Sequence, residues 1–301
     1  MDRAQLRSLF ENVNVWKRGS ERAPHKPLLL LYALGKCSRG EPRPIPYSEV
    51  DQDLQRLLRE FGPSRKSYHP EYPFWWLQND GLWELSEIEN LETRKGHTDL
   101  KKSELLRYNV TGGFPEPIYN LLCQDSQLVA EITQEVLDRS FPSSIHEDIL
   151  DAVGIELNIQ VVTRTRRAPD FRDEVMRAYE CRCAVCGLDM RLGTSQLGVE
   201  AAHIKWHQAG GPDIVQNGLA LCTLHHKMFD RGALTISQGL KILVSEHVHG
   251  TSGFEEWVLS FHGKELRVPQ SPNYYPWARF LKWHFREVFR APARYSEAVV
   301  V

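Results

Sequence analysis

Apolar residues recur at three- and four-residue steps through the first half of the chain. In a series such as Leu54, Leu57 and Phe61, this spacing places the side chains on one face of a helix. The same pattern predicts helices in four segments, namely 1–20, 25–40, 48–62 and 86–145. The first half of the chain is therefore expected to be mostly helical.

A segment rich in aromatic residues, 63–85, interrupts these helices. We expect its large apolar rings to lie mainly in the core, because such side chains are buried more often than they contact ligands. These rings are Phe74, Trp75, Trp76 and Trp83. The Asn-Asp-Gly sequence at 79–81 predicts the turn of a short β-hairpin.

The residue pattern changes near residues 160–168, where β-branched and basic residues replace the helical spacing of apolar residues. We place a boundary there, which gives two domains, 1–160 and 161–301. Three basic residues at this point could contact phosphates as well as link the domains: Arg164, Arg166 and Arg167. Farther on, residues 231–250 predict two short strands around a turn, and 274–294 predict an amphipathic aromatic helix.

Composition narrows the class of protein. The chain has 301 residues with 37 Lys and Arg against 39 Asp and Glu, so it is not a globally basic nucleic-acid binder and any DNA-binding surface must be local. Its six cysteines do not suggest a secreted disulfide framework. The N-terminus lacks a signal-peptide core, and no apolar run is long enough to cross a bilayer. We expect a cytoplasmic protein that does not enter a membrane.

Two pairs of metal-ligand residues dominate the second half of the chain. Cys183 and Cys186 are separated by two residues, and so are Cys222 and His225. Three thiolates and an imidazole suit tetrahedral Zn²⁺, and the short spacing lets both members of each pair reach one ion. The pattern predicts a structural zinc site.

Four further polar residues near these pairs could perform chemistry. His203 ends a strand-like run, Asn217 lies in a polar loop, and His226 and Asp230 are four residues apart at the start of a predicted helix. Positions i and i+4 share one helix face, so His226 and Asp230 could hold one divalent ion. A zinc module without catalysis remains the alternative, but it would leave this group of residues unexplained.

These residues resemble the HNH endonucleases, specifically the McrA-like restriction group with its ββα-metal fold. The resemblance implies that His203 is the general base, that Asn217 orients it, and that His226 binds the catalytic metal. Ala202 departs from colicin-type relatives, which have a further metal-binding histidine at that position. Asp230 then becomes the expected second ligand, and Glu200 is a weaker candidate.

The segments RAPHKPLLLLYAL, YPFWWLQNDGLWEL and NVTGGF resemble the sulfur-binding domain that precedes McrA-like HNH domains. That family recognises phosphorothioate-modified DNA, and the likeness covers roughly residues 1–150. It implies that Tyr72 and Pro73 line the sulfur pocket. An apolar cup would favour sulfur over phosphate oxygen, because sulfur is less strongly hydrated and costs less to desolvate.

Two further groups are expected to contact DNA near this pocket. The resemblance places Arg22, His25 and Lys26 near the backbone, without deciding which of the three meets the modified phosphate. Gln78 and Asn79 are candidates for reading bases, because amides can form bidentate contacts with base edges. The plain alternative for this pair is that they only form the turn.

Taken together, the sequence predicts an α+β protein of two domains, a mostly helical DNA reader with a small hairpin and a zinc-stabilised HNH nuclease. The expected activity is hydrolysis of phosphodiester bonds near a phosphorothioate in double-stranded DNA, with Mg²⁺ or Mn²⁺. Two alternatives stay open: a reader whose zinc domain is not catalytic, and a nuclease that reads another modification such as methylcytosine. A homodimer is also left open.

Overall fold

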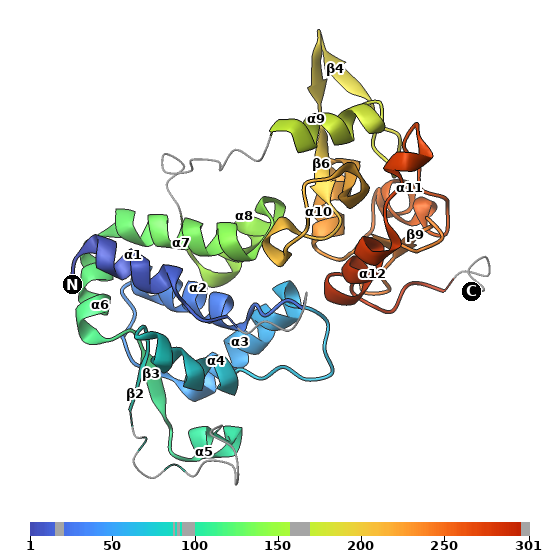
Figure 1. Cartoon of the computed structure of the whole chain (residues 1–301). Coiled ribbons are helices and arrows are strands. Elements are labelled where there is room, and N and C mark those ends of the chain that lie inside the picture. The colour runs from blue at the N-terminus through green and yellow to red at the C-terminus, as the bar shows by residue number, and fades with distance from the viewer. Residues whose placement is uncertain (16–20, 87, 89–90, 92–99, 157–168, 296–301) are drawn as a thin grey trace. The chain divides into compact units, whose positions relative to one another are not determined.

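The structure is a computed structural model that describes residues 1–15, 21–86, 88, 91, 100–156 and 169–295 (Figure 1). Its chain divides into two compact units, Met1–Thr163 and Arg164–Val301. The boundary region expected at 160–168 lies outside the described residues, and so do Arg164, Arg166 and Arg167. Among the described helices, none combines the length and apolar character needed to cross a bilayer.

Helices make up most of the N-terminal unit, as the apolar spacing predicts. They are α1 (Arg3–Glu11), α2 (His25–Ser38), α3 (Tyr47–Phe61), α4 (Glu71–Trp76), α5 (Lys102–Arg107), α6 (Glu116–Gln124), α7 (Ser126–Ser140) and α8 (His146–Val153). The leucine-rich α2 is buried on all sides from Pro27 to Cys37. It packs against α3, α4, α6, α7 and α8, and is therefore the central helix of this unit.

The expected hairpin around residues 79–81 is wrong. Residues 71–76 form α4, and the short 3-10 helix η1 (Leu77–Asp80) extends it to Gly81, which has a positive φ of 73°. Proline is tolerated in the first turn of a helix, and Phe74 and Leu77 fall three residues apart on its buried face. The strands of this unit instead come from distant segments.

Those strands form a small antiparallel sheet. In order across it they are β1 (Ile45–Pro46), β3 (Thr111–Gly113) and β2 (Glu84–Leu85). Gly112 pairs with both neighbours and lies against buried rings, so that a Cβ there would come within 2.5 Å of Trp83 Nε1. Phe74 and Trp83 are buried as expected, whereas Trp75 and Trp76 are only half-buried.

The C-terminal unit is built around a ββα arrangement. Its elements are α9 (Pro169–Ala178), β4 (Met190–Leu192), β5 (Ser195–Leu197), β6 (Val199–His203), β7 (Gly218–Cys222), α10 (Thr223–Asp230), β8 (Leu234–Ile236), β9 (Ile242–Val244), α11 (Phe254–Trp257) and α12 (Ala278–Glu287). β6 and β7 pair antiparallel, and α10 follows β7 directly and packs on both strands. The strands expected within 231–250 and the aromatic helix expected within 274–294 are present as β8, β9 and α12.

Close packing fixes the edge of this arrangement where His203 lies. His203 pairs with Gly218 in the β6–β7 ladder, and α9 packs against both strands. A Cβ on Gly218 would lie only 2.4 Å from Val175 Cγ2 on α9. The glycine therefore lets α9 approach the strand end, which brings Phe171 next to His203.

Candidate metal centre and active site

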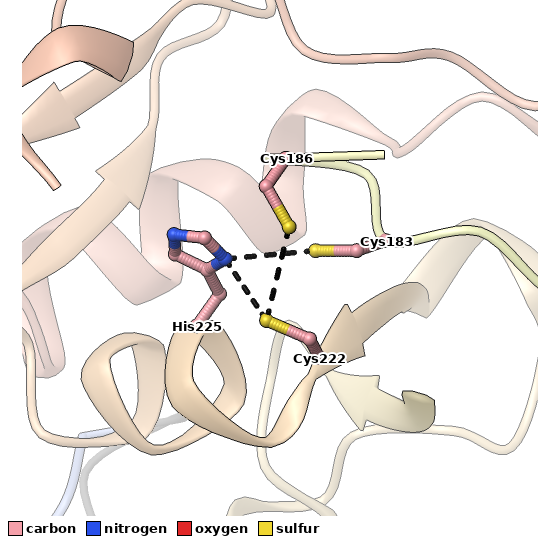
Figure 2. A group of neighbouring side chains, drawn as sticks. All are labelled: Cys183, Cys186, Cys222 and His225. Carbon is pink, nitrogen blue, oxygen red and sulfur yellow. Dashed lines mark hydrogen bonds between the residues drawn. The ribbon is translucent and has the colours of Figure 1, made fainter. Parts of the chain in front are cut away.

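The side chains of Cys183, Cys186, Cys222 and His225 converge on one point (Figure 2). Their four ligand atoms all lie within 4.8 Å of one another. Cys183 Sγ is 3.7 Å from His225 Nδ1, and Cys186 Sγ is 3.9 Å from Cys222 Sγ. Ligands at ordinary zinc bond lengths define a tetrahedron with edges of about 3.7 Å. The cluster has the composition and size of a zinc site.

Backbone hydrogen bonds bring these distant segments together. The Cys183–Cys186 turn is closed by Gly187 N–H donating to Cys183 O, at 2.8 Å. Ala184 N–H donates to Ala220 O of β7 at 2.7 Å, which ties this turn to the strand that ends in Cys222. His225 follows in the first turn of α10. All four ligands are thus held by the same ββα frame.

The surroundings of His225 also suit a metal ligand. Its Nδ1 faces the sulfur atoms, while its Nε2–H donates to Trp257 O at 3.0 Å. Because the ring proton is then on Nε2, the Nδ1 lone pair is available to a metal ion. Hydrogen bonds from Cys186 and Cys222, helped by His225, hold the pKa of the Cys183 thiol well below its ordinary value. A thiolate is the form that zinc binds, so this donor set fits Zn²⁺.

His203 lies at the end of β6 in a tightly packed environment. Only 6% of its side chain is exposed, and its ring stacks on Phe171 with a centroid separation of 4.0 Å. His203 Nε2 is 2.7 Å from Asp213 Oδ1. Donation of the Nε2 proton to this carboxylate leaves the lone pair of the neutral ring on Nδ1. Asp213 therefore orients His203, the residue that the family resemblance implies is the general base.

The Asn217 side chain bonds to the backbone of the loop that follows His203. Its Oδ1 accepts from Lys205 N at 2.8 Å, and its Nδ2 donates to Lys205 O and Pro212 O, each at 3.0 Å. These bonds close the loop between His203 and Asp213. Asn217 thus holds the backbone that leads to Asp213, and Asp213 contacts the ring; that Asn217 orients the base stays a prediction.

His226 lies between two carboxylates. Its Nδ1 is 2.7 Å from Glu200 Oε2, and its Nε2 is 3.1 Å from Asp230 Oδ2. Burial alone would lower the pKa of His226, but the charges of Asp230 and Glu200 outweigh it and raise the pKa to about 9. Before any metal binds, this ring is therefore a protonated bridge between two acids.

The two carboxylates differ sharply in exposure. The Glu200 side chain is 54% exposed, whereas that of Asp230 is 2% exposed. The other Asp230 oxygen, Oδ1, accepts from Trp206 Nε1 at 3.0 Å. Both Asp230 oxygens thus have buried partners, one of them His226 itself, while Glu200 is the more accessible of the two carboxylates. That Asp230 is the second metal ligand stays a prediction.

The sulfur-pocket candidates lie on α4 and on α2, which pack against each other. Tyr72 is half-buried, and its ring stacks on that of His69 with centroids 5.0 Å apart. Pro73 is buried and contributes more to the core than to an open cup. Burial, followed by the nearby charges of His69 and Arg65, lowers the pKa of His25 to about 4. His69 therefore links the other two residues: its ring stacks on Tyr72, and its charge acts on His25.

The other DNA-contact candidates have partners within the unit. Arg22 donates to Phe61 O at 2.6 Å, and Lys26 Nζ forms an ion pair of 2.5 Å with Asp80. Gln78 Nε2 donates to Trp75 O at 2.8 Å, and Asn79 is exposed. Among these four, only Asn79 presents an exposed side chain.

Two residues of the site, Asp213 and Trp206, were not assigned from sequence, and Glu200 was named only as a weaker candidate for metal binding. Asp213 lies ten positions after His203, and no sequence spacing predicts a contact between residues that far apart in a loop. The contact becomes visible only because the loop between them is closed by the Asn217 bonds. Glu200 gives a weak signal: it shares a strand face with Ala202, because side chains alternate along β6. A long side chain at 200 can therefore reach His226 from the strand.

Comparison with known proteins agrees with this geometry. The HNH endonuclease family model matches residues 183–237, the segment that carries the zinc cluster, His203 and His226. The model of the ScoMcrA-like DNA sulfur-binding domain matches residues 3–158, which is more than half of the chain. The chain belongs to this ScoMcrA-like family and joins its DNA sulfur-binding domain to an HNH endonuclease domain. A search of curated proteins gives no match.

Several solved structures also match the chain. The sulfur-binding domain of ScoMcrA complexed with phosphorothioated DNA is 24% identical, with 50% of this chain and 94% of that chain covered and a TM-score of 0.44. The sulfur-binding domain of SprMcrA complexed with phosphorothioated DNA is 23% identical, with 52% of this chain and 95% of that chain covered and a TM-score of 0.43. The Type IV phosphorothioation-dependent restriction endonuclease ScoMcrA is 23% identical, with 49% of this chain and 32% of that chain covered and a TM-score of 0.42.

Proposed function

We propose that the chain is a modification-dependent restriction endonuclease that binds phosphorothioate-modified double-stranded DNA and hydrolyses phosphodiester bonds nearby. The carrying observation is the presence, on one chain, of a DNA sulfur-binding domain and an HNH domain that keeps both His203 and His226. Residues 1–160 would read the modification and residues 161–301 would cut. A non-catalytic zinc module would not need an oriented His203.

The reader site combines an apolar ring with nearby cations. The Tyr72 ring supplies a face against which a weakly hydrated sulfur costs little to bury. His25 is held neutral at pH 7 by its low pKa, and an approaching phosphorothioate would favour its protonated form. Arg22 and Lys26 would stabilise this part of the unit through Phe61 and Asp80, and Asn79 is free to reach a base edge.

In the nuclease site His203 removes the proton from the attacking water. The Asp213 carboxylate holds the ring by its Nε2 proton and stabilises the imidazolium that forms. Stacking on Phe171 and the Asn217-bonded loop keep the ring in one orientation. Each of these contacts exists before substrate binds, so little reorganisation is needed at the moment of reaction.

His226 and Glu200 would hold a catalytic Mg²⁺ or Mn²⁺, with Asp230 and Trp206 orienting the imidazole from its buried side. Such an ion supplies Lewis-acid stabilisation of negative charge on the scissile phosphate and the leaving oxygen. The histidine must lose its proton to ligate, so metal binding at neutral pH would release a proton.

The decisive experiment is digestion of matched duplexes that differ only by one phosphorothioate, with Mg²⁺ and with Mn²⁺. We expect cutting of the modified duplex alone, and loss of cutting but not of binding in His203→Ala. Binding without cutting by the wild type would indicate a reader with a non-catalytic zinc domain. Cutting of methylcytosine duplexes instead would assign the reader to another modification.

A further inference from the structure

Two cations of the C-terminal unit have no acidic partner in the part of the chain that the structure describes. They are Lys205, two positions after His203, and Arg279, in the first turn of α12. By contrast, Lys26 and Lys36 of the other unit form ion pairs with Asp80 and Glu49. A fixed positive charge without a counter-charge is a feature of anion-binding surfaces.

The position of Lys205 is set by its backbone. The Asn217 amide bonds to both Lys205 N and Lys205 O, at 2.8 and 3.0 Å, so the residue cannot drift from the catalytic loop. Its ammonium lies near the Gly210 turn, where a Cβ would be 4.0 Å from Nζ. Lys205 is therefore held in the same loop that orients His203 through Asp213.

Arg279 is held by aromatic rings. Its guanidinium carbon lies 4.2 Å from the ring centroid of Trp277 and 4.7 Å from that of Phe280, and the two rings are 13° from parallel. Such stacking fixes a guanidinium while leaving its N–H groups able to donate. Trp277 N–H donates to Gln216 O at 3.1 Å, which ties this cluster to the residue before Asn217.

The two charges are close enough to affect each other. Burial lowers the pKa of Lys205, and the positive charge of Arg279 lowers it further. Trp277 beside them is 42% exposed, so a flat apolar surface adjoins the pair. Two mutually repelling cations next to an exposed ring match the chemistry of a sugar-phosphate backbone, in which a phosphate bridges the charges and the ring contacts a sugar or base.

We propose that Lys205 and Arg279 form a clamp for a DNA backbone phosphate adjacent to the scissile one, with Trp277 against the neighbouring nucleotide. The clamp rests on the proposed nuclease function and adds the element that places the strand. Because Asn217 and Gln216 connect both cations to the His203 loop, a phosphate held here is positioned relative to the base. Lys205 and Arg279 are positioning residues and do not enter the chemical step.

The test is the salt dependence of binding of the full chain to an unmodified duplex without added divalent ion. Each neutralised phosphate contributes about 0.9 to the slope of log K against log salt concentration, so losing this one phosphate contact in Lys205→Ala with Arg279→Ala should lower the slope by about 1. Lys282→Ala, an exposed lysine on the same helix, is the matched control and should leave the slope unchanged.

Zinc content shows whether each variant is folded. If the double alanine variant loses zinc, the single variants Lys205→Gln and Arg279→Gln replace it: retained zinc with a lowered slope in either one supports the clamp, and a wild-type slope in both overturns it. An unchanged slope in a zinc-loaded double alanine variant also overturns it. If the slope is unchanged but the wild type cuts DNA, only the clamp is refuted. If the slope falls but the wild type does not cut DNA, only the proposed nuclease function is refuted.

Discussion

The low pKa of His25 makes a quantitative prediction about stability. The ring is neutral in the folded protein down to about pH 4, whereas in the unfolded chain it accepts a proton near its ordinary value of 6.5. A group with a lowered folded pKa contributes stability above the unfolded value and loses it as pH falls through the window between the two. Stability of the N-terminal unit should therefore decrease from pH 6.5 to pH 4.

The size of this loss follows from linkage. Each pH unit in the window costs about 1.4 kcal/mol per proton, so this histidine alone should make unfolding about 2 kcal/mol easier at pH 5 than at pH 8. Other acids titrate in the same range, and the comparison must therefore be made with His25→Gln, which keeps a polar side chain of similar size but cannot titrate.

The assay is urea denaturation of wild type and His25→Gln at both pH values. The free energy of unfolding should fall more steeply in the wild type, with a difference between the two proteins of about 2 kcal/mol. Equal pH dependence in the two would refute the reasoning, because it would show that His25 is accessible to protons in the folded state. A phosphorothioate duplex should reduce the difference if its charge lies beside the ring.

Three further predictions concern zinc, sulfur and the catalytic metal. Cys222→Ser should lose zinc and unfold the C-terminal unit, whereas Cys181→Ser, outside the cluster, should retain both in metal analysis and circular dichroism. Tyr72→Ala should lower the preference for phosphorothioate over ordinary DNA in competition binding at fixed salt; an unchanged preference would make Tyr72 a structural residue only. In calorimetry of zinc-loaded protein, Glu200→Gln should abolish Mn²⁺ binding, while Asp230→Asn weakens it about tenfold. The opposite ranking of these two variants would reverse their roles.

The local parts of the metal centre could be predicted because their information is local. Each zinc-ligand pair spans four residues, and the strand before His203, the loop around Asn217 and the helix at His226 follow from short local patterns, whereas the strand between that loop and the helix was implied only by the family resemblance. That HNH segment is matched by its family model over 183–237. What these residues would bind or catalyse remains a prediction.

Contacts between segments that are distant in the chain could not be predicted from the sequence. Lys26 is 54 positions from Asp80, so nothing in the sequence marks their ion pair. The Asn-Asp-Gly signal at 79–81 was overridden by helix α4, whose buried face is fixed by packing with α2 and α3. The contact between His203 and Asp213 likewise depends on how the Asn217 amide closes a loop, and turn propensities do not report that.

The candidate zinc site and the proposed catalytic-metal site of the C-terminal unit are joined by one peptide bond. His225 turns its Nδ1 to the three sulfur atoms, and the next residue, His226, turns to Glu200 and Asp230. In the proposed enzyme, loss of zinc would misplace His226 whatever the supply of Mg²⁺. Specific activity would then report the zinc loading of a preparation: a half-loaded sample should give half the turnover at an unchanged KM. A chelator would inactivate the protein in two stages, of which only the first is reversed by adding Mg²⁺.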